Sequence, residues 1–414
     1  MRTGKDTGLG AGRFLAAGRA PTDVTTTLHE LTTLDGATVS GVLRVPKAAR
    51  SVVTLMHPRR DMTHHAVVPH LLRAGMAVWT QHSRSVNNDL VLLHEQVLLD
   101  AAVGLAFLRD RGFETVVTFG HSGGGPLYAF YIEQASLAPA DRVTTTPGGR
   151  PVALDEADMP IPDAAIFLAP HPGQGALLLG CIDPSVADEA DPLSVRPDLD
   201  PFDPANGFRP APESSRYTPE FAAAYRAAQH DRVASIDAIA RTHLSDAADA
   251  RRRHRKSGDR WDRRTVIAPR VMTVPRTDAD LRCMDLSLDP SDRPYGSVFG
   301  RRPDLTNYGR VGFGRLTTPE AWLSTWSGLS SRADFARSAA GVRVPSLLLE
   351  LTGDQACFPS QTATMFAALA VEDRTLCRVP GTHFGGPLAE GDPTGIELAT
   401  DRLLPWLDER FLRR

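Results

Sequence analysis

Residues 115–125 read Thr-Val-Val-Thr-Phe-Gly-His-Ser-Gly-Gly-Gly. A short β-branched run meets glycines that surround one serine, Ser122, and small residues suited to a helix start follow. This G-x-S-x-G pattern is typical of a sharp strand-to-helix turn that presents the serine as a nucleophile. Such a turn strains the backbone and leaves no room for side chains two positions away, so Gly120 and Gly124 suit their places. The helix that follows favours negative charge developing at its N-terminus.

The segments around this stretch alternate between strand and helix patterns. Strand character is found at 24–45, 51–56, 76–80, 115–121, 164–168, 346–351 and 374–379. Helical patterns separate these runs at 65–73, 89–111, 126–134, 361–370 and 395–411, with Asn88 or Asp89 as the expected cap of the second helix. The alternation predicts an α/β fold with a doubly wound, mostly parallel sheet.

The alternation stops after residue 168 and returns near residue 344. A proline- and aspartate-rich stretch, a helix at 218–257 and an irregular aromatic segment fill the interval. Loops of that length are unusual, so a large insertion, mainly helical and irregular, is expected within one core. The predicted organisation is a flexible tail at 1–22, a core at 23–180, the insertion at 181–340 and the rest of the core at 341–414.

The composition is ordinary for a soluble globular protein and excludes several classes. Of 414 residues, 42% are hydrophobic and 23% charged, and the net charge of −3 gives no general attraction to nucleic acid or membranes. The apolar run at 14–17 is too short for a signal peptide or a membrane span. Four widely spaced cysteines indicate free thiols in a reducing compartment. We therefore expect a cytoplasmic protein without nucleic-acid or membrane partners, and leave open whether it forms a homo-oligomer.

A serine nucleophile needs a base within hydrogen-bonding reach and a carboxylate that orients the base. In this architecture the chain order is serine, acid, histidine. His383 is the only histidine after residue 254, and Asp354 follows the strand at 346–351. Both fall at the carboxyl ends of expected parallel strands, where open α/β sheets place their sites. The order predicts a triad of Ser122, Asp354 and His383, with Glu350 and Asp183 as weaker candidates for the acid.

Stabilising an oxyanion takes two N–H donors. One is expected from Gly123, directly after the nucleophile. The other is expected from the loop after the strand at 51–56, where Pro58 has no N–H and Arg59 is the candidate. Side chains expected to contact substrate are His57, Arg60, His121, Trp322 and Trp326.

The turn at 120–124, the Gly353-Asp354 pair and the loop at 381–383 resemble the α/β-hydrolase superfamily in their order along the chain. The resemblance covers about 24–170 and 344–414. The stretches at 57–59, 83–89 and 356–359 are also similar to a poorly characterised bacterial subgroup with a long cap. The resemblance implies a serine hydrolase that needs no cofactor, with the insertion as a cap over the active site. It implies no substrate, because this fold hosts many chemistries.

These observations predict a hydrolase that cleaves a carboxylic ester or lactone through an acyl-enzyme. The same triad would serve a thioesterase, an acyltransferase, or a hydrolase of amide or carbon–carbon bonds, and a non-catalytic binding protein is the alternative of another class. No metal is expected, because the histidines near Asp61 lack ligand spacing. The basic run at 251–256 is expected to be a solvated face, or else to steer an acidic thioester toward the cap.

Overall fold

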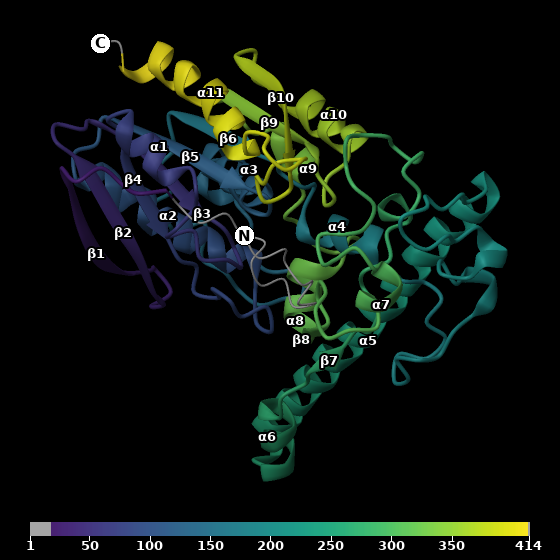
Figure 1. Ribbon diagram of the computed structural model, residues 1–414. Helices are drawn as coiled ribbons and strands as arrows, with labels where there is room; N and C mark the ends of the chain where they lie inside the picture. Colours follow the sequence, from purple (N-terminus) through teal and green to yellow (C-terminus); the bar gives the residue numbers. More distant parts are fainter. Residues whose placement is uncertain (1–17, 413–414) are drawn as a thin grey trace.

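The computed structural model describes residues 18–412 (Figure 1), so residues 1–17 of the predicted tail lie outside the described residues. Eight strands form one sheet in the order β1-β2-β4-β3-β5-β6-β9-β10. Their bounds are β1 Val24–Thr32, β2 Thr38–Pro46, β3 Ser51–Met56, β4 Ala77–Gln81, β5 Thr115–His121, β6 Ala164–Leu168, β9 Ser346–Gly353 and β10 Arg374–Thr382. Of these eight strands, β2 alone runs opposite to the other seven. This topology is that of the α/β-hydrolase fold, so the predicted fold class is confirmed.

Helices cover both faces of the sheet (Figure 1). One face packs against α2 (His94–Asp110), α3 (Gly124–Ser136), α9 (Phe335–Ala339) and α10 (Pro359–Ala368). The other packs against α1 (Val68–Arg73) and α11 (Gly395–Leu407). Because the central strands are buried on both sides, they read as continuous apolar runs, as in Ser51–Met56, where every residue is buried.

The start of α2 differs from the prediction. The helix begins at His94, with Leu93 at the N-cap position and no side-chain cap. Asn88 instead accepts the Leu90 amide in a local turn, and the Asp89 carboxylate pairs with Arg59. The capping prediction for these two residues was wrong because a more distant cation binds the carboxylate.

The segment between β6 and β9 contains most of the irregular chain. Besides α9 and three short 3-10 turns, it contains α4 (Gln174–Cys181), α5 (Pro219–Ser257), α6 (Arg260–Ile267), β7 (Met272–Thr273), α7 (Pro303–Thr306), β8 (Leu316–Thr317), α8 (Pro319–Ala321) and a π-helical turn at Trp322–Trp326. Side chains of α4, α5 and the π-helical turn share a core of their own. The far end of α5 projects with α6 from the rest of the molecule, and the basic run at 251–256 lies there (Figure 1).

The longest helix of the described chain, α5, is polar over most of its surface. Within residues 18–412, no helix combines the length and the apolar character that a membrane span requires.

Candidate active site

Ser122 stands on the predicted turn between β5 and α3. Its φ of 55° lies in the left-handed region, which L-residues adopt only where the surroundings force it. A Cβ at Gly120 would lie 2.4 Å from the Gly124 carbonyl oxygen, and one at Gly124 would lie 2.6 Å from the Met56 carbonyl oxygen. The two glycines therefore permit the close chain crossing that exposes the serine hydroxyl.

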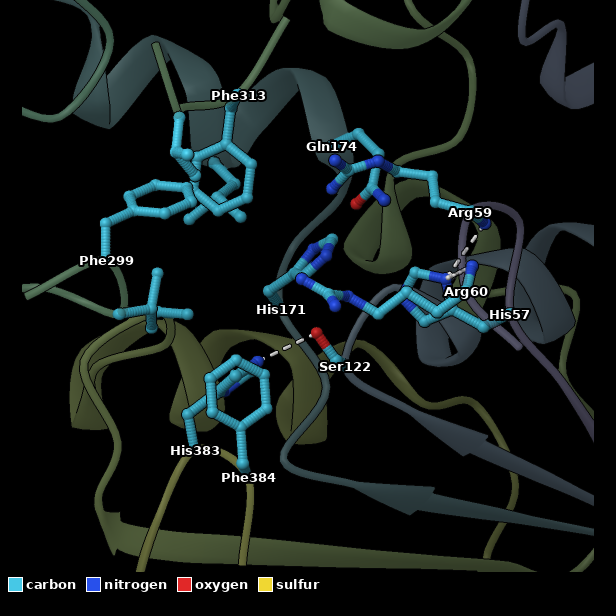
Figure 2. Close-up of a pocket in the computed structure, with 14 residues that line it drawn as sticks. His57, Arg59, Arg60, Ser122, His171, Gln174, Phe299, Phe313, His383 and Phe384 are labelled. Carbon is cyan, nitrogen blue, oxygen red and sulfur yellow. Dashed lines mark hydrogen bonds between the residues drawn. The ribbon is translucent and has the colours of Figure 1, made fainter. Parts of the chain in front are cut away.

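The structure brings Ser122, His383 and Asp354 together in one hydrogen-bonded chain (Figure 2 shows the first two). Ser122 Oγ lies 2.9 Å from His383 Nε2, and His383 Nδ1 lies 2.8 Å from Asp354 Oδ2. A carboxylate only accepts hydrogen bonds, so the ring proton sits on Nδ1 and Nε2 is free to accept the serine proton. This is the geometry that base-assisted attack by a serine requires.

Asp354 is held by its own turn at the end of β9. Its Oδ1 accepts the amides of Ala356 at 2.6 Å and Cys357 at 3.1 Å, and the side chain is nearly fully buried. The two rival acids are bound elsewhere. Glu350 accepts from Arg378 Nε at 2.9 Å, and Asp183 forms a buried ion pair with Arg276.

Two further histidines lie behind the base. The Val67 amide donates to His65 Nδ1 at 3.2 Å, and burial lowers the pKa of His65 to about 4, so this neutral ring carries its proton on Nε2. That proton points at His121 Nδ1, 2.8 Å away, and His121 Nε2 in turn donates to the His383 carbonyl at 2.8 Å. His121 was predicted to contact substrate. It does not line the cavity beside Ser122, and instead fixes the backbone of the loop that carries His383.

The loop after β3 corrects the predicted oxyanion donor. The Arg59 amide donates to His57 Nδ1 at 2.9 Å, and the Arg60 amide donates to the same atom at 3.1 Å. The Arg59 N–H therefore points at an imidazole and not toward Ser122. Pro58 supplies no N–H, and the two amides that follow it both donate to His57 Nδ1.

The side chains of Arg59 and the two tryptophans belong to a packed wall. The Arg59 guanidinium binds both oxygens of Asp89 and lies 4.7 Å from the Trp326 ring centre. Trp322 is fully buried and donates its indole N–H to Asp237 at 2.7 Å. Neither tryptophan lines the cavity, so the predicted substrate contacts from these residues were wrong. Both rings are fully buried in the core that the insertion shares with α4.

A cavity of about 110 Å³ opens beside Ser122 (Figure 2). Side chains from the loops after five strands, from α4 and from the insertion line it: His57, Arg59, Arg60, Ser122, His171, Gln174, Leu177, Val298, Phe299, Val311, Phe313, Ala356, His383 and Phe384. Arg60, one of the predicted contacts, is largely buried here, and burial together with Arg59 lowers its pKa to about 10. The walls are mainly apolar, with cationic and neutral polar groups near the serine.

Sequence reasoning missed His171 and Gln174. Both follow β6 closely, and the rule that sites gather at the carboxyl ends of parallel strands identifies this loop as well as the other four. The Gly173 amide donates to His171 Nδ1 at 3.1 Å, and burial holds the pKa of His171 well below its usual range. No group of three or more potential metal ligands occurs among residues 18–412.

Comparisons with known proteins find likenesses among solved structures alone. The chain matches no protein-family model and no curated protein. Among solved structures it aligns over 94% of its length with 99% of an α/β hydrolase from Penicillium sp. sh18, at 13% identity and a TM-score of 0.47. It also aligns over 95% of its length with 96% of a hypothetical protein from Pseudomonas aeruginosa, at 13% identity and a TM-score of 0.47. An esterase from Pyrococcus furiosus aligns over 98% of its chain with 96% of this one, at 10% identity and a TM-score of 0.42. None of these likenesses transfers a substrate to this chain.

Proposed function

We propose that this protein is a serine hydrolase that cleaves a carboxylic ester or lactone. The observation that carries the proposal is the continuous hydrogen-bonded chain from Ser122 Oγ through the His383 ring to the Asp354 carboxylate. It stands on a strained nucleophile turn and opens into a cavity, and these are the parts that acyl transfer from an ester needs.

In the proposed reaction, His383 Nε2 takes the Ser122 proton while the serine oxygen attacks the substrate carbonyl. The carbonyl π electrons move onto its oxygen, and the tetrahedral intermediate then collapses and expels the alkoxide, which receives the proton from His383. A water molecule deprotonated by His383 attacks the acyl-enzyme in the same way and releases the acid. Asp354 keeps the imidazole in the tautomer that each step requires.

The insertion is proposed to act as a cap that selects the acyl group. Phe299 and Phe313 of this segment, together with Leu177 of α4, contribute to the apolar part of the wall of the cavity that Ser122 also lines. The cavity, at about 110 Å³, is small beside the roughly 300–1,000 Å³ of typical ligand pockets. A short acyl chain is therefore the proposed occupant, with the leaving group toward the cavity mouth.

A series of p-nitrophenyl esters and simple lactones tests the proposal. The wild-type protein should hydrolyse acetate and butyrate esters faster than octanoate esters, and the Ser122→Ala variant should lose this turnover. The Cys377→Ala variant, altered at a free thiol that does not line the cavity, serves as the matched control and should retain it. Equal turnover by wild type and Ser122→Ala would refute the proposal.

A further inference from the structure

Two side chains with no role in the proposed reaction, His57 and Gln174, lie beside Gly123, the residue that follows the nucleophile. A Cβ placed on Gly123 would lie 2.9 Å from His57 Nε2 and 2.7 Å from Gln174 Nε2. Both groups therefore press against the residue that follows the nucleophile. Both also line the same cavity as Ser122 (Figure 2).

The proton of His57 is assigned by its surroundings. Nδ1 accepts two backbone amides, those of Arg59 and Arg60, and so carries no proton. Burial, reinforced by the Arg60 and Arg59 charges, holds the pKa of His57 well below its usual range, so the ring is neutral. Its single proton is then on Nε2, the atom that faces Gly123. The two amides act as a clamp that orients this N–H donor.

Gln174 begins α4 and is buried at 1% exposure. Neither its Nε2 nor its Oε1 has a hydrogen-bond partner among residues 18–412. A buried carboxamide left without partners destabilises a fold, so such a group in a native site suggests a role in binding. Here the carboxamide faces the space beside the nucleophile, where an incoming carbonyl oxygen would accept its N–H.

The amide of Gly123 supplies the third donor. Gly123 is the N-cap residue of α3, and N–H groups at a helix start have no partner within the helix. His57 Nε2 and Gln174 Nε2 therefore lie beside the residue whose amide would donate the third hydrogen bond.

We propose that the oxyanion hole of this protein is completed by two side chains, His57 and Gln174, in place of a backbone amide from the loop after β3. The inference rests on the proposed function. When Ser122 Oγ bonds to the carbonyl carbon, the C=O π pair moves to the oxygen and the serine proton goes to His383. The oxygen then accepts from Gly123 N–H, His57 Nε2–H and Gln174 Nε2–H. These bonds strengthen only as its charge develops, so they accelerate attack without tightening ground-state binding.

Buried glutamines at two places allow a matched experiment. Gln174→Leu removes a donor that has no protein partner, whereas Gln134→Leu removes a buried group whose Oε1 accepts the Val143 amide at 2.8 Å, far along α3 from the serine. We expect Gln174→Leu to lower kcat for a p-nitrophenyl ester by about 10²–10³-fold with KM unchanged and no loss of Tm. Gln134→Leu should lower Tm and leave kcat unchanged.

A second pair of variants addresses His57. His57→Phe should lower kcat to a similar degree, and His57→Gln, which returns an N–H near the position of Nε2, should recover part of the loss. The inhibition constant of an alkyl trifluoromethyl ketone, which forms a tetrahedral adduct with the serine, should rise in proportion to the fall in kcat/KM.

The outcomes separate the two proposals. Ser122-dependent turnover in the wild type, with kcat of Gln174→Leu and His57→Phe within threefold of it, would overturn this inference alone. If His57→Phe fails to fold, Gln174→Leu decides the question by itself. Absence of Ser122-dependent turnover in the wild type would overturn the proposed function and this inference with it.

Discussion

The substitution Gly123→Ala isolates the geometry of the oxyanion hole with a single methyl group. Gly123 has φ −63° and ψ −13°, angles that alanine adopts without strain. The new Cβ would lie 2.7 Å from Gln174 Nε2, about 0.7 Å short of the 3.4 Å at which ordinary contact begins. It would also lie 2.9 Å from His57 Nε2. The Gln174 carboxamide ends a flexible side chain and should retreat, whereas the His57 ring, which accepts two backbone amides, should shift by a few tenths of an ångström.

We expect the Gly123→Ala variant to fold as the wild type does and to lose most of its turnover. Alanine adopts these backbone angles, which favours the fold by about 0.4–1 kcal/mol through the unfolded state, and the displacement of two side chains opposes this gain, so Tm should change by no more than about 3 °C. Loss of one oxyanion donor costs about 10²–10³-fold in kcat, and the methyl group displaces at least one. Steady-state kinetics on a p-nitrophenyl ester measure this drop, with KM expected unchanged.

A matched control is Gly148→Ala, whose Cβ would come 3.2 Å from the end of the Leu244 side chain, outside the cavity. It should leave kcat unaltered. A Gly123→Ala variant with kcat within threefold of wild type would refute the reasoning, because it would mean that no required donor occupies the space beside this residue.

Three other substitutions or conditions test separate parts of the account. Asp354→Asn should lower kcat by roughly 10⁴-fold while the protein still folds, since an amide oxygen can accept the same two backbone N–H groups; kcat within tenfold of wild type would contradict this. Trp322→Phe should lower the free energy of unfolding by about 1–3 kcal/mol through loss of the bond to Asp237, and a changed KM with unchanged stability would contradict its place in the core. Burial lowers the pKa of His65 to about 4 and of His94 to about 3, whereas both return to about 6.5 on unfolding. The unfolded state therefore binds more protons below pH 6.5, and the free energy of unfolding should fall on acidification by up to about 1.4 kcal/mol per pH unit for each histidine. An unfolding midpoint in guanidinium that does not change between pH 7 and pH 4.5 would contradict this.

The arrangement of the candidate triad could be predicted because it depends on rules that act along the chain. The glycines at 120–124 are required by local sterics, and chain order together with strand ends singles out one acid and one base. No other histidine competed with His383 for the role of base, since none follows residue 254 except His383 itself. The outlines of the sheet could be predicted for the same reason, because the central strands are compact, mostly apolar runs.

The remaining features depend on contacts between distant segments. The position of Arg59 after β3 favoured its amide as an oxyanion donor. That amide instead donates to His57 Nδ1, and the spacing of residues in the sequence does not predict the orientation of the His57 ring. The sequence position of Asp89 predicted a helix cap, but its carboxylate pairs with the Arg59 guanidinium. Trp322 and Trp326 lie in an insertion whose packing has no periodic pattern, so which aromatic faces the cavity could not be deduced.

Gln174 illustrates a different limit. A glutamine at the start of a helix has no distinctive sequence signal, and its interest lies in having no partner once buried. Only a three-dimensional structure shows that both of its polar atoms face the nucleophile turn unsatisfied. His171, by contrast, could have been found from its place after β6.

The most direct test of the central claim is intact-mass analysis of the full chain after treatment with a fluorophosphonate. An activated serine should form one covalent adduct, which peptide mapping should place on Ser122. The adduct should be absent in Ser122→Ala and should form much more slowly in His383→Ala. A folded wild-type protein that forms no adduct with this reagent or with a smaller organophosphate, or that carries the adduct on another residue, would contradict the claim that Ser122 is the nucleophile.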